Sequence, residues 1–103
     1  MSKVLKEKEL VEYADGSVVS RALVQNKSGS LTLFAFDEGQ GLSEHTAPYD
    51  AMARVLDGEA FIVIGGEEFT LVEGESIIMP ANVPHALDAK KRFKMMLTMI
   101  KEI

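Results

Sequence analysis

Two histidines are the residues of this chain best suited to chemistry. His45 lies between Gly39 and Gly58, and His85 follows Gly74 in the stretch GESIIMPANVPHALDA. An imidazole can bind a metal ion, move a proton or hydrogen-bond a ligand near neutral pH. The chain has no cysteine, so thiolate chemistry and disulfides are excluded. A shared site therefore requires a fold that brings the two histidines together.

Other catalytic and binding motifs are missing from the sequence. It contains no Gly-x-Ser-x-Gly elbow and no glycine-rich phosphate loop followed by Lys-Ser or Lys-Thr. Acidic residues outnumber basic ones by 16 to 11, and the formal net charge of −5 repels phosphate backbones. The basic run of Lys90, Lys91, Arg92 and Lys94 is expected to flank an apolar strand and protect its edge. We expect no nucleic-acid partner.

Length and composition favour one globular domain, which we place at residues 1–103. Hydrophobic residues make up 47% of the chain, enough for a core. Because a short chain buries only a modest share of its surface, we expect a homodimer. No apolar run approaches the ~18 residues of a membrane span, and the charged N-terminus MSKVLKEKEL does not resemble a signal peptide. We expect a cytoplasmic protein with no membrane partner.

Short stretches of strand-forming residues recur along the chain, and no segment keeps a helical period. Asp15-Gly16 has the composition of a type I′ turn, and Gly65-Gly66 that of a two-residue hairpin. Asp57-Gly58 is expected to end a strand. The predicted strands are 9–13, 18–24, 31–36, 51–56, 60–64, 69–72, 76–79 and 93–100. This pattern predicts an all-β barrel or sandwich.

The glycines and histidines also form two short spaced motifs. In the first, five residues separate Gly39 from His45, and Gly58 follows later in the chain. A similar arrangement follows later in the chain, where Gly74, five residues and Pro80 precede His85. Asn82 lies between Pro80 and His85, and asparagine tolerates left-handed backbone.

From about residue 18 to the end, the chain resembles the cupin superfamily of small, RmlC-like jelly-roll barrels. The resemblance implies a double-stranded β-helix with its core at about 18–101, together with an N-terminal strand at 9–13.

Cupins of this type usually hold a metal with three histidines and one glutamate, and this sequence departs from that set. His45 and His85 occupy two of the four positions. Ala47 stands in the place of the second histidine, and Ala51 (or Met52, with the longer gap) in that of the glutamate. Asp50 is the best substitute carboxylate, although it is also suited to hydrogen-bond a backbone amide. The resemblance therefore leaves a reduced or absent metal site.

The leading hypothesis is a small-molecule-binding cupin with a pocket framed by the two histidines. The residues predicted to line it are His45, Ala47, Tyr49, Ala51, Met79, His85 and Met96. The alternative is a metal-dependent enzyme of dioxygenase, isomerase or hydrolase type. There, His45 and His85, with Asp50 or water, would hold Zn, Ni, Fe or Cu. A third alternative is a structural barrel whose apolar outer faces serve assembly.

Overall fold

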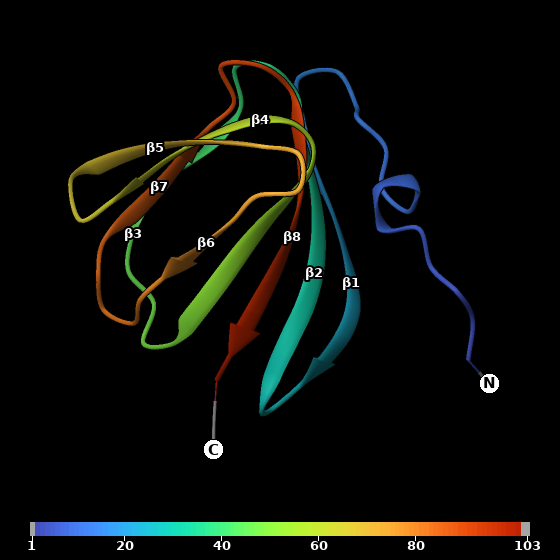
Figure 1. Cartoon of the computed structure of the whole chain (residues 1–103), viewed down its shortest axis with the longest axis horizontal. Helices are drawn as coiled ribbons and strands as arrows, with labels where there is room; N and C mark the ends of the chain where they lie inside the picture. Colours follow the sequence, from blue (N-terminus) through green and yellow to red (C-terminus); the bar gives the residue numbers. More distant parts are fainter. Residues whose placement is uncertain (1, 102–103) are drawn as a thin grey trace.

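The computed structural model describes residues 2–101, so Met1 and residues 102–103 of the predicted domain lie outside it. Within these residues a curled, eight-stranded antiparallel sheet forms a half-barrel, which confirms the all-β jelly-roll prediction (Figure 1). The elements are the 3₁₀ helix η1 (Glu7–Glu9) and the strands β1 (Val18–Asn26), β2 (Gly29–Phe36), β3 (Gly41–His45), β4 (Asp50–Ile64), β5 (Glu67–Val72), β6 (Ser76–Met79), β7 (His85–Asp88) and β8 (Phe93–Ile100). The described helix, with its three residues, is far too short to cross a membrane.

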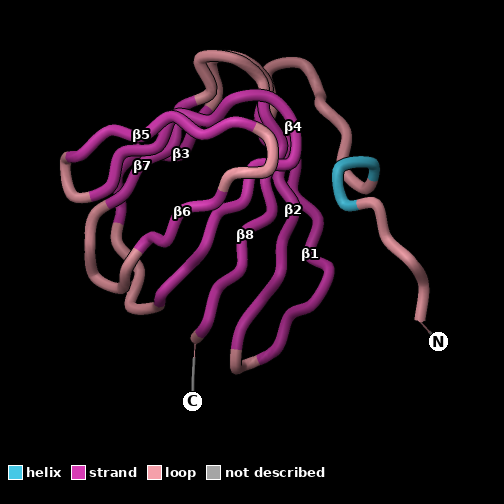
Figure 2. Tube along the Cα trace, in the orientation of Figure 1, coloured by secondary structure: helices cyan, strands magenta, loops and turns pink. Residues whose placement is uncertain are grey.

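Strand β4 connects the two halves of the half-barrel (Figure 2). Its first part pairs with β8 and β6, and its second part pairs with β5 and β7. The predicted break at Asp57-Gly58 is therefore wrong, because β4 is continuous over 15 residues. A bulge between Val55 and Asp57, followed by Gly58 at φ +77°, bends the strand from one half into the other without ending it.

The two predicted glycine turns have different outcomes. Gly65 and Gly66 both have positive φ, and Ile64 pairs with Glu67, so the predicted hairpin is confirmed. At Asp15-Gly16 only the glycine has positive φ, so this turn is not type I′. A type I′ turn needs positive φ at both central residues.

Residues 9–13 do not form the predicted strand. Glu9 ends η1, and the chain then crosses the outer face of the sheet without strand pairing. Val11 is buried there against Leu33 and Ala35. The apolar residues that suggested a strand thus cover one side of the sheet from outside.

The basic run fastens this N-terminal segment. Strand β8 lies between β2 and β4, so the expected protection of a strand edge does not apply. Lys94 is buried instead, and its Nζ donates a hydrogen bond of 2.6 Å to the carbonyl oxygen of Lys8. Arg92 and Lys94 both lie over the Tyr13 ring, and the Tyr13 hydroxyl donates to Asp57 at 2.7 Å.

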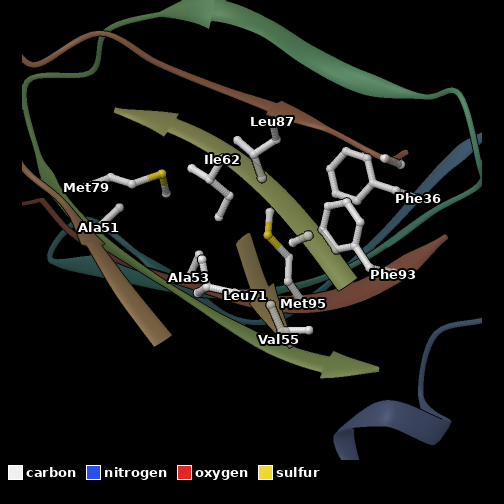
Figure 3. Close-up of a cluster of buried hydrophobic side chains, with 12 residues drawn as sticks. Phe36, Ala51, Ala53, Val55, Ile62, Leu71, Met79, Leu87, Phe93 and Met95 are labelled. Atoms are coloured by element: carbon white, nitrogen blue, oxygen red, sulfur yellow. The ribbon is translucent and has the colours of Figure 1, made fainter. Parts of the chain in front are cut away.

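The core fills the concave side of the half-barrel (Figure 3). Alternate residues of β4 and β8 face inward because side chains alternate along a strand. Phe36 and Phe93 stack at one end with ring centroids 4.5 Å apart, and both are fully buried. Met79 and Ala51 lie at the opposite end of the cluster.

Candidate functional site

Strands β3 and β7 bring the two histidines into contact. His45 and His85 are partners in the β3–β7 register, and their ring centroids are 4.4 Å apart at an interplanar angle of 70°. A Cβ on Gly41 would overlap the carbonyl oxygen of Leu87, so glycine allows β3 to lie this close to β7. The convergence that any shared site requires is present.

A tight loop before β7 positions His85. Asn82 has φ +65°, a left-handed conformation that asparagine tolerates, and its N–H donates to the carbonyl of Ala47 at 2.8 Å. This bond ties the segment after His45 to the segment before His85. Pro84 favours an extended approach to the histidine. The loop and the β3–β7 pairing together fix both rings.

Each histidine uses the same ring nitrogen to contact the backbone carbonyl of the residue two positions earlier. Nδ1 of His45 lies 2.8 Å from the carbonyl oxygen of Ser43, and Nδ1 of His85 lies 3.2 Å from that of Val83. A carbonyl oxygen can only accept, so both Nδ1 atoms carry the hydrogen. In the neutral rings, both Nε2 atoms are therefore left with a free lone pair.

The two rings differ in their surroundings. His85 is 7% exposed, whereas His45 is exposed to solvent. Burial lowers the pKa of His85 below its ordinary value; the Val83 carbonyl opposes this, and the neighbouring His45 ring lowers the pKa further. His85 is thus neutral at physiological pH and acts as an acceptor through Nε2.

A small cavity of about 50 Å³ opens beside the histidines. Its walls are almost entirely apolar and come from β3, β4, β6, β7 and β8. The lining residues are Leu42, His45, Ala47, Ala51, Met79, His85, Leu87, Met95, Leu97 and Met99.

Five of the seven predicted pocket residues lie at this cavity, while Tyr49 and Met96 do not. Met96 packs in the second apolar cluster, on the outer face of the sheet. The prediction that Met96 lines the pocket was wrong. Side chains alternate along a strand, and Phe93 and Met95 show that the odd-numbered residues of β8 face the core. The same alternation would have identified Leu97 and Met99, which sequence reasoning missed. Tyr49 lies half-buried in the loop between β3 and β4.

The described residues do not complete a metal site. Oδ1 of Asp50 accepts the backbone N–H of Ala81 at 2.8 Å, so this carboxylate stabilises a loop, the second of its two expected roles. Ala47 and Ala51 contribute only methyl groups to the cavity. Within residues 2–101, no three or more His, Cys, Asp or Glu side chains gather closely enough to bind a metal ion. The donor set does not fit the four-ligand centre that the resemblance implies.

Comparison with known proteins identifies one matching family profile and several similar solved structures. The sequence profile of the cupin domain matches residues 32–101. A conserved protein of unknown function from Streptococcus pyogenes is 39% identical over 100% of this chain and 90% of its own, with a TM-score of 0.94. A cupin superfamily protein from Desulfitobacterium hafniense is 30% identical over 99% of this chain and 94% of its own, with a TM-score of 0.92.

A third solved structure is longer than this chain. The Cupin 2 conserved barrel domain protein from Leptotrichia buccalis is 42% identical over 91% of this chain but only 46% of its own length, with a TM-score of 0.89. No curated protein gives a significant match. These relatives establish ancestry and architecture, so any activity has to be argued from the site itself.

Proposed function

This chain belongs to the cupin domain family, and we propose that it binds a small organic molecule in the cavity beside His45 and His85. The observation that carries the proposal is the contact between the two rings at an otherwise apolar cavity. Sites for small molecules typically combine apolar walls with a few polar groups that converge. Here the imidazoles are the polar groups.

The arrangement of the walls gives the bound molecule an orientation. His45 is exposed at the open side, while Met79, Leu87 and Met95 are buried. A ligand would therefore place a polar group against the histidines and an apolar group against the methionines, whose flexible side chains adapt to different shapes. A cavity of about 50 Å³ is small, so it accommodates a compact ligand or one end of a larger molecule.

A metal-dependent enzyme is the weaker candidate. The two free Nε2 lone pairs are its only support, because zinc enzymes generally use three protein ligands and iron facial triads add a carboxylate to two histidines. Asp50, the carboxylate proposed for that role, is hydrogen-bonded to the Ala81 amide. The small-molecule proposal needs no missing ligand.

A fragment screen by NMR tests the proposal, with protein labelled at the methionine methyl groups. We expect compounds that bind to shift Met79, Met95 and Met99, which line the cavity, and to leave Met52 and Met96 on the outer face unchanged. Ala47→Leu should abolish those shifts, since the larger side chain occupies the cavity. Shifts confined to the outer-face methionines, or binding that survives Ala47→Leu, would contradict the proposal.

The homodimer expected from the size of the chain is also a proposal, and the outer face of the sheet supports it. The strand register places Val24, Leu31, Thr98, Met52 and Ile78 in one row across β1, β2, β8, β4 and β6. Val24 and Ile78 are 50% and 55% exposed. The N-terminal segment covers the neighbouring part of this face, and we propose that a second copy of the chain covers the row.

Sedimentation velocity tests the dimer with two matched variants. Ile78→Lys introduces a charge into the exposed row and should give a monomer, because burying an unpaired charge at an interface is unfavourable. Val72→Lys changes a similarly exposed residue on β5, in the other half of the molecule, and should leave the dimer intact. A monomeric parent protein, or two variants that behave alike, would show that this row is not the interface.

The cytoplasmic location remains a proposal. The lack of a nucleic-acid partner is also a proposal, and it rests on the net charge of −5.

A further inference from the structure

We infer that the ligand group held by His45 and His85 is a neutral hydrogen-bond donor, with a primary carboxamide as the best fit, and that carboxylates and ammonium groups are rejected. The inference rests on the proposed binding function and specifies the chemistry of the same cavity. It follows from what the two rings and the remaining walls can offer a ligand.

The backbone contacts of the two histidines fix the direction of any hydrogen bond to a ligand. Both Nδ1 atoms are committed as donors to the carbonyls of Ser43 and Val83. In the neutral rings, each histidine can therefore present only an acceptor, Nε2, to a ligand. In the described residues, every fully buried side-chain nitrogen or oxygen has a hydrogen-bond partner. Among these residues, Nε2 of His85 has no such partner, so it is not fully buried, and His85 lines the cavity. The ligand has to supply the hydrogens.

An anion does not fit this cavity. Apart from the two imidazoles, the lining residues are alanine, leucine and methionine, and none of these side chains donates a strong hydrogen bond. A carboxylate would face two nitrogen lone pairs and lose the hydration on the side that faces the rings without compensation. Burying a charge on these terms is strongly unfavourable.

A cation does not fit this cavity either. Among the residues that the structure describes, no carboxylate lines the cavity, and the nearby Asp50 is engaged by the Ala81 amide. An ammonium group would find two acceptors but no counter-charge in an apolar enclosure. An unpaired buried charge costs more than a neutral donor that makes the same hydrogen bonds.

A primary amide has as many donor hydrogens as the two rings have acceptors. The two ring centroids are 4.4 Å apart, and each ring offers one acceptor. A primary amide nitrogen carries two hydrogens, so one group can serve both rings, and its carbonyl can face the water at the exposed side of His45. A short branched alkyl group then suits the methionine and leucine walls.

Isobutyramide and isobutyrate make a matched pair of probes because they share the same carbon skeleton and differ in one polar group. We would titrate each into methionine-methyl- and histidine-¹⁵N-labelled protein at mildly alkaline pH, where histidine side chains are ordinarily neutral. We expect isobutyramide to shift the Met79, Met95 and Met99 methyls and both Nε2 resonances. Isobutyrate should bind at least about tenfold more weakly, as expected for a desolvated charge without a donor.

Two variants assign the effect to the acceptor. His45→Ala removes one exposed acceptor and should weaken isobutyramide binding about threefold to tenfold, the range for one neutral hydrogen bond. Glu44→Ala alters the neighbouring exposed residue, which does not line the cavity, and should have no effect.

The possible failures are distinguishable. If isobutyrate binds as tightly as isobutyramide, the ligand class is wrong while small-molecule binding stands. If neither probe binds and the fragment screen also finds nothing, the proposed function itself fails. Long-range ¹H–¹⁵N spectra that show hydrogen on Nε2 of either neutral ring would overturn the premise that both rings are acceptors.

Discussion

Replacing Gly58 with alanine should lower the free energy of unfolding by about 2–6 kcal/mol, measured by urea denaturation. Gly58 has φ +77°, and forcing an L-residue into this region costs about 1–3 kcal/mol. A Cβ at this position would also overlap the carbonyl oxygen of Arg92, and overpacking of this kind adds about 1–3 kcal/mol. Both costs arise where β4 bends past β8.

Two other glycines separate these costs. Gly74 has φ +90°, and no heavy atom of residues 2–101 beyond its chain neighbours lies within 4 Å of the position that a Cβ would occupy, so Gly74→Ala should show the backbone cost alone. Gly41 lacks a positive φ, but its Cβ would overlap the Leu87 carbonyl, so Gly41→Ala should show the steric cost alone and disturb the β3–β7 pairing. If Gly58→Ala lowers the free energy of unfolding no more than Gly74→Ala does, the close approach of β4 to β8 adds no steric cost.

Gly58 also explains where sequence reasoning about the fold stops. The ends of β6 and β8 were predicted at their observed residues, because Gly74, Pro80 and a run of apolar residues are local signals. Whether a glycine ends a strand or bends it depends on the residue with which it pairs in the neighbouring strand. For Gly58 that partner is Phe93, in a strand far along the chain. No local pattern in β4 contains this information.

The N-terminal segment illustrates the same limit. Residues 9–13 have the composition of a strand, yet their contacts are with distant residues. The Tyr13 hydroxyl donates to Asp57, and Lys94 donates to the Lys8 carbonyl. A buried lysine that donates to a carbonyl of the short 3₁₀ helix η1 depends on tertiary packing, which strand propensity does not capture.

The candidate site was predictable in part. Motif spacing placed His45 and His85 together, and the contact between their rings agrees with that expectation. The tautomer of each ring was not predictable, because it depends on the Ser43 and Val83 carbonyls two residues earlier. The choice of Met96 over Met95 was an avoidable error, since alternation along β8 already specified the phase.

Replacing Phe93 with alanine should lower the free energy of unfolding by about 3–5 kcal/mol, the range for removing a large buried ring. Phe93 is fully buried and stacks on Phe36 at 4.5 Å, so the substitution leaves a cavity and an unpaired ring. A domain of ordinary stability has only about 5–15 kcal/mol to lose. Phe61→Ala, at a partly exposed ring beneath Lys90, should cost clearly less. Equal losses in the two variants, measured by urea denaturation, would contradict the central role of the stacked pair.

The position of Phe93 makes this variant informative about the site as well. The stacked rings lie at the end of the core away from Met79 and Ala51, which line the cavity beside the histidines (Figure 3). Phe93→Ala should therefore lower stability while the fraction that stays folded keeps the His45–His85 contact and its affinity for isobutyramide. Loss of binding in the folded fraction would mean that the stacked pair also positions the histidine site, through β8 and its inward methionines.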